Sequence, residues 1–326
     1  MHALSPSPAP QSPFLQLQLY TDFDGTLTTA DTLSALSQLP KTPPKPWAYF
    51  VDAYREDLQL SLPPVPVPKL LSTGDRRTRT TLPQEAEYLE SLLPIERRSI
   101  ERLERAGFFA GLSAARLRRY GFESAVTGAV GIRDGWWEVL AYLNDVHHKK
   151  HTIAVISVNW SSEFIKGVLS GSYHLWCHQQ GLTPTGSHQS LADAISIHSN
   201  DLLISPETHL TTGGFSRRCP PPVDRGVWAA ADKLSVMEEL SSHTTPSAVT
   251  VYMGDSPPDL LCLLKANVGV VVGRDKELME AYGRLGLPVE EGLLHGPCSV
   301  RGEMGNRLFR VETFGEVLTW LKSERE

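Results

Sequence analysis

Two aspartates near the start of the chain have the spacing of a metal-binding or catalytic pair. Asp22 and Asp24 follow the alternating apolar run 15–20 and stand directly before Gly25. The run predicts a strand, and the glycine allows the chain to leave the sheet at that point. Two close carboxylates repel each other unless a cation or a shared proton separates them. The pair therefore predicts a metal site, although an ordinary Asp-rich turn would have the same pattern.

Polar residues also follow two later apolar runs. The runs 152–156 and 249–253 are nearly continuous, which is typical of strands buried on both faces. Ser157 follows the first run, and Asp255 follows the second with Asp259 just beyond. Because the carboxyl ends of parallel strands lie at one edge of a sheet, we expect these side chains to meet the aspartate pair. Carboxylates and a hydroxyl together favour a hard cation and a phosphate group.

The elements that must position these residues alternate between strand and helix. Apolar runs that predict strands lie at 15–20, 152–156, 249–253, 268–272 and 308–311, and helical periodicity predicts helices between and after them. This alternation predicts an α/β fold with a doubly wound, mostly parallel sheet. One of the helices, at 232–240, carries Lys233, which adds a positive charge to the predicted site.

A long insertion separates the first strand from the rest of the sheet. Between 34 and 130, Pro-rich patches interrupt segments whose apolar residues have helical spacing, and no alternating strand pattern is found. We therefore expect an α/β core made of 14–33 and 131–326, with a helical cap at 34–130. The Pro/Ser-rich segment 1–13 has no signal-peptide pattern and is expected to be a flexible lead-in.

The composition narrows the class of protein. The chain has 326 residues, 41% of them hydrophobic, with 31 Lys+Arg against 37 Asp+Glu and a formal charge of -6. A negative charge argues against nucleic acid as a partner, and no apolar run is long enough to cross a bilayer. Four scattered cysteines favour a reducing compartment. We expect a cytoplasmic protein that does not bind a membrane, and the oligomeric state stays open.

Taken in order, the candidate residues resemble the four motifs of the haloacid dehalogenase-like (HAD) phosphohydrolases. The matching segments are Asp22-Phe23-Asp24-Gly25-Thr26, then Ser157, then Lys233, then Gly254-Asp255-Ser256-Pro257-Pro258-Asp259. The position of the insertion is similar to that of the helical cap in phosphoserine phosphatase-like members. The segment 254–272 also resembles the HAD domain of plant thiamine monophosphate phosphatases. The resemblance implies a Rossmann-like core and Mg²⁺ as cofactor.

The resemblance also implies a role for each acid. Asp22 would be the nucleophile that forms an aspartyl-phosphate. Asp24 would protonate the leaving group and then deprotonate water, and its backbone carbonyl rather than its side chain would bind the metal. Asp22, Asp24 and Asp255 would thus hold Mg²⁺. Asp259 would orient a metal-bound water or Lys233.

Other residues are expected to hold the phosphate. Ser157 and Lys233 would contact the phosphoryl oxygens, and the backbone N–H groups of Phe23 and Asn159 are candidates for the same task. The acid at position 24 favours ester hydrolysis over dehalogenation, because a halide leaving group needs no proton.

The substrate is less well defined. Asp31, Trp47 and Trp160 are candidates for substrate contact, because they follow the first two motifs and an aromatic ring could stack on a flat leaving group. Phosphoserine phosphatases have glycines after the second motif, so Asn159 and Trp160 argue against phosphoserine. We expect an Mg²⁺-dependent phosphomonoesterase for a small organic phosphate, with thiamine monophosphate as one candidate. A phosphomutase and a catalytically silent binding or regulatory protein are the alternatives.

Overall fold

The computed structural model describes residues 16–40, 42–60, 79–146, 151–182, 190–216, 226–243, 248–292 and 307–323. The expected lead-in, 1–13, lies outside these residues. No helix in the described ranges is both long enough and apolar enough to cross a membrane.

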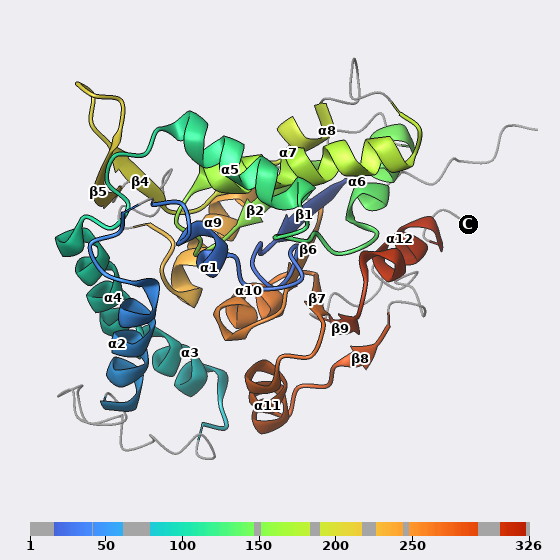
Figure 1. Cartoon of the computed structure of the whole chain (residues 1–326). Helices are drawn as coiled ribbons and strands as arrows, with labels where there is room; N and C mark the ends of the chain where they lie inside the picture. Colours follow the sequence, from blue (N-terminus) through green and yellow to red (C-terminus); the bar gives the residue numbers. More distant parts are fainter. Residues whose placement is uncertain are drawn as a thin grey trace, which may run out of the picture.

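A seven-stranded sheet forms the centre of the molecule (Figure 1). The strand order is β3-β2-β1-β6-β7-β9-β8, and every pair is parallel. The strands are β1 (Leu17–Thr21), β2 (Thr152–Ile156), β3 (Ser196–His198), β6 (Val249–Gly254), β7 (Val268–Val272), β8 (Glu290–Glu291) and β9 (Arg307–Val311). The predicted parallel α/β fold is confirmed. The sequence did not predict the edge strands β3 and β8, which are too short to show a pattern.

The register of the central strands brings the first and last motifs to one edge. β1 lies between β2 and β6, with Thr21 opposite both Val155 and Met253. The backbone N–H of Asp22 then donates to the Met253 carbonyl at 2.9 Å. The chain therefore leaves the sheet at the same level after β1, β2 and β6.

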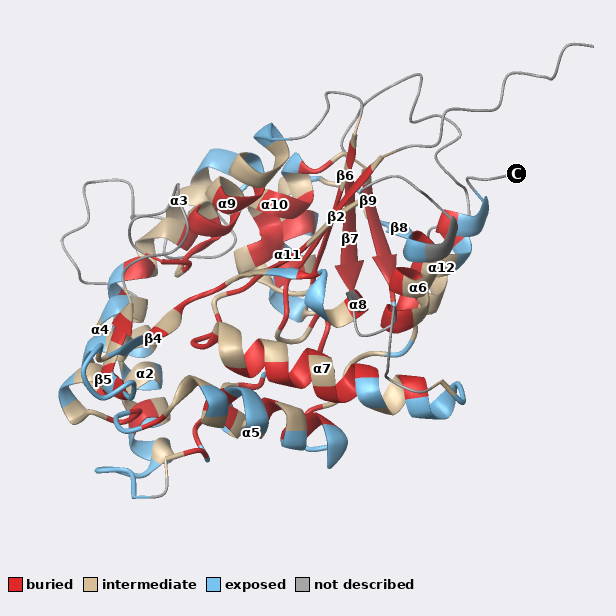
Figure 2. Ribbon diagram, turned by 90° about the horizontal axis from the view of Figure 1, so that it is seen from above, coloured by how far each residue is buried: buried red, intermediate tan, exposed pale blue. Residues whose placement is uncertain are grey.

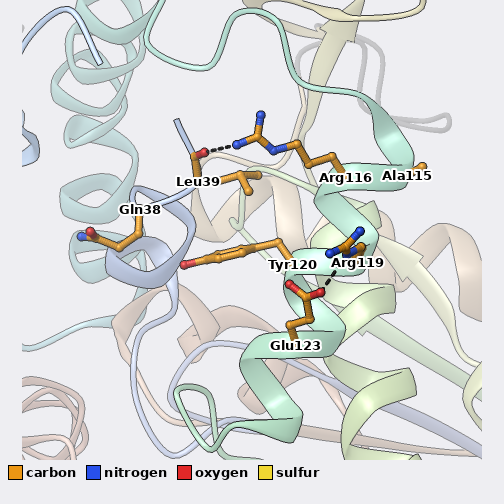
Figure 3. A pocket seen from close by; sticks show the side chains of 7 residues that line it. All are labelled: Gln38, Leu39, Ala115, Arg116, Arg119, Tyr120 and Glu123. Atoms are coloured by element: carbon orange, nitrogen blue, oxygen red, sulfur yellow. Dashed lines mark hydrogen bonds and ion pairs between the residues drawn. The ribbon is translucent and has the colours of Figure 1, made fainter. Parts of the chain in front are cut away.

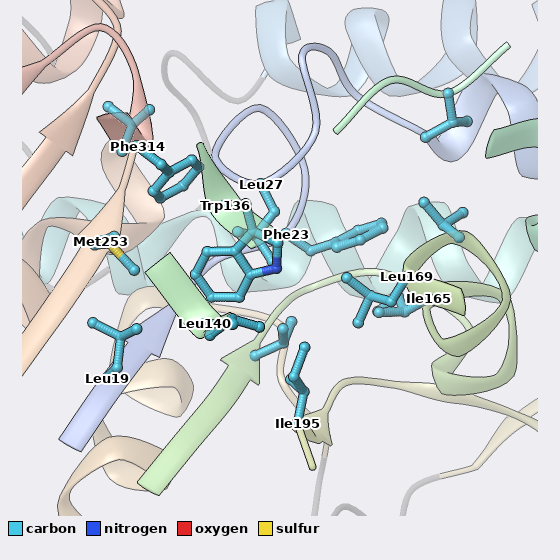
Figure 4. Packing of buried hydrophobic residues seen from close by; sticks show 14 of the residues in the cluster. Leu19, Phe23, Leu27, Trp136, Leu140, Ile165, Leu169, Ile195, Met253 and Phe314 are labelled. Carbon is cyan, nitrogen blue, oxygen red and sulfur yellow. The ribbon is translucent and has the colours of Figure 1, made fainter. Parts of the chain in front are cut away.

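Helices cover both faces of the sheet (Figure 2). Alternate strand residues point to opposite sides. Leu19, Val251 and Val270 pack under α6 (Trp136–Val146), α7 (Ser162–Gln179) and α12 (Phe314–Ser323). Figure 4 shows part of this cluster around the fully buried Trp136. On the other face, Tyr20 and Tyr252 pack under α9 (Ala230–Ser242), α10 (Leu260–Lys265) and α11 (Lys276–Leu285). Two short helices, α8 (Ser190–Asp193) and the 3-10 helix η4 (Pro257–Asp259), complete the core.

The insertion is helical in all its described regular elements. It contains α1 (Leu33–Leu36), α2 (Trp47–Leu60), α3 (Leu82–Ser91), α4 (Leu93–Ala106) and α5 (Ala114–Val126). A capping box between Thr81 and Gln84 begins α3, and Gly107, at φ 59°, ends α4. α2 and α4 pack together, whereas α5 lies along α7 and α3 lies against α9.

Glycines allow α5 to lie unusually close to α7. A Cβ atom on Gly167 would lie 2.0 Å from the Arg118 carbonyl oxygen, and one on Gly121 would lie 2.3 Å from that of Phe164. The two helices therefore meet backbone to backbone, and the last helix of the insertion is packed directly onto the core.

The segment after β3 forms an antiparallel hairpin, β4 (Asp201–Ile204) and β5 (Thr211–Ser216). The hairpin packs against the insertion: Thr211 N–H donates to the Leu112 carbonyl at 2.7 Å, and Phe215 N–H donates to Glu104 Oε1 at 2.9 Å. A segment from the second half of the chain thus lies beside α4.

Candidate active site

Asp22 forms the centre of a buried charge cluster at the carboxyl edge of the sheet. It follows β1, and Lys233 Nζ, from the first turn of α9, lies 3.0 Å from its Oδ2. Burial raises the pKa of Asp22 well above its ordinary value, and the positive charge of Lys233 offsets only part of that rise. Asp22 Oδ1 is buried and has no hydrogen-bond partner among the described residues.

Lys233 is fully buried and joins the first motif to the last. Its Nζ donates to Asp259 Oδ1 at 2.7 Å and also contacts Asp22. Burial alone would lower the pKa of Lys233, but the two carboxylates raise it above its ordinary value. The ammonium group therefore stays charged and supplies the positive charge expected from the sequence.

Both carboxylate oxygens of Asp259 accept hydrogen bonds from neighbouring residues. Its Oδ1 accepts from Lys233 Nζ and from the Tyr252 hydroxyl at 2.8 Å. Its Oδ2 accepts from the backbone N–H groups of Asp255 and Ser256, each at 3.2 Å, and from the Ser256 hydroxyl at 3.2 Å. Asp259 thereby holds the turn that carries Asp255 in place, and it also orients Lys233.

Asp255 lies against the loop that carries the aspartate pair. Thr26 Oγ1 donates to Asp255 Oδ1 at 2.7 Å. Gly25 has a φ of 77°, and a Cβ atom there would lie 2.3 Å from Asp255 Oδ2. Only a glycine permits this approach and this backbone angle. Burial, and then the Asp259 carboxylate, raise the pKa of Asp255 to about 7.

These acids fit a divalent cation. Carboxylate oxygens of Asp22, Asp255 and Asp259 lie within 4.8 Å of one another. Hydrogen bonds already use both oxygens of Asp259, whereas Asp22 Oδ1 is a buried anionic oxygen without a donor in the described part of the chain. A buried oxygen of this kind is costly unless a cation or proton meets it. Asp22 and Asp255 are therefore the best-placed side-chain ligands.

The side chain of Asp24 faces away from this group. Its Oδ1 accepts from the Thr32 N–H at 2.7 Å and from Thr32 Oγ1 at 2.6 Å, and its Oδ2 accepts from Asn159 Nδ2 at 2.8 Å. Burial and the Asp31 carboxylate raise the pKa of Asp24, while the donors of Thr32 and Asn159 lower it, and the net shift is upward. A well-held carboxyl with a raised pKa suits a proton carrier.

Ser157 and Asn159 lie at the end of β2, as the sequence predicts. Both are fully buried, and the Ser157 N–H donates to the His198 carbonyl at 2.9 Å. The Asn159 N–H, a predicted phosphate contact, donates to Ser157 Oγ at 3.1 Å. The asparagine side chain contacts Asp24, so Asn159 joins the proton carrier to the Ser157 loop.

The three candidates for substrate contact lie in two different settings. Asp31 is exposed, and its Oδ1 accepts from the Leu33 N–H at 2.8 Å. Trp47 and Trp160 meet edge to face with ring centroids 5.9 Å apart. Trp160, 8% exposed, also lies edge-on to Phe109 and Phe215. The aromatic pair thus belongs to a cluster shared by the core, the insertion and the hairpin.

Sequence reasoning missed the supporting role of four residues at the site. Thr26, Thr32 and Tyr252 bond to Asp255, Asp24 and Asp259 respectively, as described above. Arg133 is the fourth: its Nη2 donates to the Gly25 carbonyl at 2.8 Å and its Nε to the Thr26 carbonyl at 3.1 Å. Thr26 belongs to the first motif, but the motif does not indicate which residue accepts its hydrogen bond. The others lack a local signal, because their partners are distant in sequence or depend on side-chain direction.

A pocket of about 710 Å³ lies between α5 and the segment that follows α1 (Figure 3). Its wall includes Arg116, whose Nη2 donates to the Leu39 carbonyl at 2.9 Å, and Tyr120, whose hydroxyl donates to the Ala35 carbonyl at 3.1 Å. None of the acids described above lines it. These bonds fasten the start of the insertion to α5.

Comparison with known proteins gives two curated relatives, and no protein-family model matches the chain. A CTO1 family protein of Schizosaccharomyces pombe is 25% identical over 266 residues, which cover 81% of this chain and 84% of that protein. The bifunctional TH2 protein of Arabidopsis thaliana, named as mitochondrial, is 24% identical over 199 residues, or 61% of this chain. This match spans 28% of the Arabidopsis protein, little more than a quarter of its length.

Among solved structures, the chain is similar to phosphoserine phosphatases. A substrate-bound phosphoserine phosphatase matches with a TM-score of 0.44 and 12% identity, covering 94% of this chain and 99% of that one. A phosphoserine phosphohydrolase-like protein from Francisella tularensis matches with a TM-score of 0.43 and 13% identity, covering 93% and 99%.

Proposed function

We propose that this chain is an Mg²⁺-dependent phosphatase of the HAD-like type, which hydrolyses a small organic phosphate through an aspartyl-phosphate. The observation that carries the proposal is the state of Asp22. This carboxylate is buried, one of its oxygens is held by Lys233 and the other has no hydrogen-bond partner in the described parts of the chain. A carboxylate that is paired with a cation at one oxygen and left without a donor at the other suits a nucleophile.

In the first step, an electron pair of the Asp22 carboxylate forms a bond to phosphorus as the bond to the ester oxygen breaks. The carboxyl of Asp24 gives its proton to that oxygen, so the leaving group departs as an alcohol. Lys233, 3.0 Å from Asp22, balances negative charge on the phosphoryl oxygens, and the buried Ser157 hydroxyl is the second donor proposed for them.

In the second step, the ionised Asp24 takes a proton from a water molecule as that water attacks the phosphorus of the aspartyl-phosphate. The bond between phosphorus and the Asp22 oxygen breaks, which restores the carboxylate and releases inorganic phosphate. Asp24 therefore starts and ends the cycle protonated. Its upward-shifted pKa favours the protonated form that the first step needs.

Asp22 and Asp255 would hold the Mg²⁺, with the backbone carbonyl of Asp24 as a further proposed ligand. The bound cation would offset the repulsion between the Asp22 carboxylate and the phosphate dianion. Asp259 keeps Asp255 and Lys233 in position, through the hydrogen bonds to the Asp255 N–H and to Lys233 Nζ.

We infer a small substrate, because the insertion lies beside the site and Trp160 follows Asn159 directly. Trp47 and Trp160, from opposite sides of the boundary between insertion and core, are proposed to contact a flat leaving group. Thiamine monophosphate remains one candidate, on the resemblance of 254–272 to plant phosphatases of that ester. A panel of metabolite phosphates would identify the substrate.

The basic test is release of phosphate from p-nitrophenyl phosphate, with Mg²⁺ and with EDTA. We expect turnover only with Mg²⁺, and none from an Asp22→Asn variant. Rapid acid quench with ³²P-labelled substrate should leave label on the wild-type protein that hydroxylamine removes. An Asp22→Asn variant with full turnover, or wild-type turnover unaffected by EDTA, would refute the proposal. A requirement for a sugar bisphosphate would instead indicate a phosphomutase.

A further inference from the structure

The carboxylate of Asp24 is held by a closed set of hydrogen bonds that also includes Thr32 and Asn159. Thr32 donates to Asp24 Oδ1 through both its N–H and its hydroxyl, at 2.7 and 2.6 Å. Asn159 Nδ2 donates to Asp24 Oδ2 at 2.8 Å and to Thr32 Oγ1 at 3.0 Å. Each of the three side chains therefore contacts the other two.

The orientation of the Asn159 amide is determined by its surroundings. Its Oδ1 accepts from the Ser161 N–H at 3.2 Å, and both hydrogens of Nδ2 are used by Asp24 and Thr32. A reversed amide would place an oxygen against the Asp24 carboxylate and an NH₂ group against an N–H. The fully buried Asn159 therefore has one arrangement in which its polar atoms are satisfied.

The donors on Asp24 come from two separate parts of the chain. Thr32 directly precedes α1, where the insertion begins, and Asn159 follows β2 of the core. The segment after Thr32 is itself fastened to α5, through Tyr120 to the Ala35 carbonyl and Arg116 to the Leu39 carbonyl. The Asp24 side chain is thus clamped between the core and the start of the insertion.

We propose that Thr32 and Asn159 are positioning residues for Asp24, and that Asn159 serves proton transfer through its side chain rather than binding the phosphate with it. This inference rests on the proposed phosphatase function. Proton transfer needs the carboxyl within hydrogen-bond reach of the leaving oxygen, so a small rotation of Asp24 is costly. The donors leave the side chain little freedom to rotate toward Lys233 or a metal.

Substrates with different leaving groups distinguish the positioning of Asp24 from a role in phosphate binding. p-Nitrophenolate leaves with little help from an acid, whereas an alkoxide needs the proton of Asp24. Loss of the Thr32 hydroxyl should therefore slow an alkyl phosphate more than p-nitrophenyl phosphate, and a lost phosphate ligand would slow both equally. General acid catalysis supplies roughly 10²–10⁴-fold, so we expect the alkyl-to-aryl ratio of kcat/KM to fall by about tenfold or more.

The primary variant is Thr32→Val, which removes the hydroxyl and keeps the shape and the backbone N–H. Thr32→Ser restores the hydroxyl and should restore the ratio. Thr29→Val is the matched control, because Thr29 is exposed on the same loop and no hydrogen bond among the described residues joins it to Asp24. Asn159→Leu tests the second donor, with thermal unfolding to verify that the variant folds and the inhibition constant of inorganic phosphate as a separate readout.

An equal loss on both esters in Thr32→Val, or a weaker inhibition constant for phosphate with an unchanged ratio in Asn159→Leu, would overturn the proposal. Absence of any wild-type turnover would instead refute the proposed function. A crystal structure of Thr32→Val decides the positioning role in that case as well. We expect the Asp24 carboxylate to have left its wild-type position, and an unmoved carboxylate would contradict the inference.

Discussion

Replacing Lys233 with methionine tests whether the buried charge cluster is held together as described. The substitution keeps the length and most of the apolar contacts of the side chain but removes its charge. Lys233 is fully buried, with Nζ 2.7 Å from Asp259 Oδ1 and 3.0 Å from Asp22 Oδ2. The variant therefore leaves two buried carboxylates without their common cation.

The expected cost follows from these distances. At an effective dielectric constant of about 20, each contact is a gross attraction of roughly 6 kcal/mol. The loss of this attraction is partly offset, because methionine, unlike lysine, has no charge to desolvate on folding. Breaking a buried ion pair on one side typically costs about 3–5 kcal/mol, and we expect a loss of that size in the free energy of unfolding near neutral pH.

The pH dependence of the loss has a definite sign. Burial already raises the pKa of Asp22, and removal of Lys233 raises it further. A protonated carboxyl needs no counter-charge, so the difference between variant and wild type should be largest at high pH and shrink as the pH falls. Mg²⁺ should reduce the difference, because the cation would supply positive charge to the same Asp22 carboxylate through Oδ1, the oxygen that Lys233 does not contact.

The measurement is urea unfolding followed by tryptophan fluorescence, in EDTA and in Mg²⁺, at acidic and alkaline pH. Lys265→Met is the matched control, since Lys265 Nζ lies 3.0 Å from Glu238 Oε1 but both side chains are about half exposed. Such surface pairs contribute about 0–1 kcal/mol. Equal losses in Lys233→Met and Lys265→Met at alkaline pH would refute the reasoning.

Three further predictions concern the surroundings of the acids. Gly25→Ala should abolish activity and destabilise the fold, because its Cβ would lie 2.3 Å from Asp255 Oδ2. Gly128 has the same φ of 77° and nothing within 4 Å of a Cβ built on it. Gly128→Ala should therefore cost only about 1–2 kcal/mol of unfolding free energy and no activity. Burial and Asp259 raise the pKa of Asp255 to about 7 from 3.8. In EDTA the free energy of unfolding should therefore fall as the pH rises from about 4 to 7, and Mg²⁺ should remove this fall. A pH-independent urea midpoint in EDTA would contradict the prediction. Trp160→Ala should cost about 3–5 kcal/mol of unfolding free energy, because the residue is 8% exposed and its ring packs on three aromatic rings. A raised KM without this loss of stability would mean that the ring only contacts substrate.

The positions of the main polar residues at the strand ends were predictable because their signal is local. Asp22, Ser157 and Asp255 each follow an apolar run, and the ends of parallel strands meet at one edge whatever the side chains around them. The approach of Gly25 to Asp255 has a sequence correlate as well, since a glycine after an aspartate pair predicts a change of backbone direction. Lys233 was predictable from the helix that carries it and from its place in the motif order, although most lysines on helices are exposed to solvent.

The surroundings of these acids were not predictable in the same way. Thr32 is an ordinary threonine in a polar loop, and its bond to Asp24 depends on how the chain turns after Gly25. Asn159 was expected to serve the phosphate through its backbone, yet its side chain contacts Asp24. Arg133 and Tyr252 have partners set by packing between separate elements, and no spacing along the chain encodes such contacts.

The sequence by itself determined the parallel α/β core, the helical character of the described insertion and the identity of the clustered acids, because periodicity and strand ends are local properties. Only the tertiary structure decided how the aspartate pair divides. Asp22 faces Lys233 and Asp255, whereas Asp24 faces Thr32 and Asn159. The two carboxylates leave the same strand two residues apart, and their different environments come from elements that are far away in the sequence.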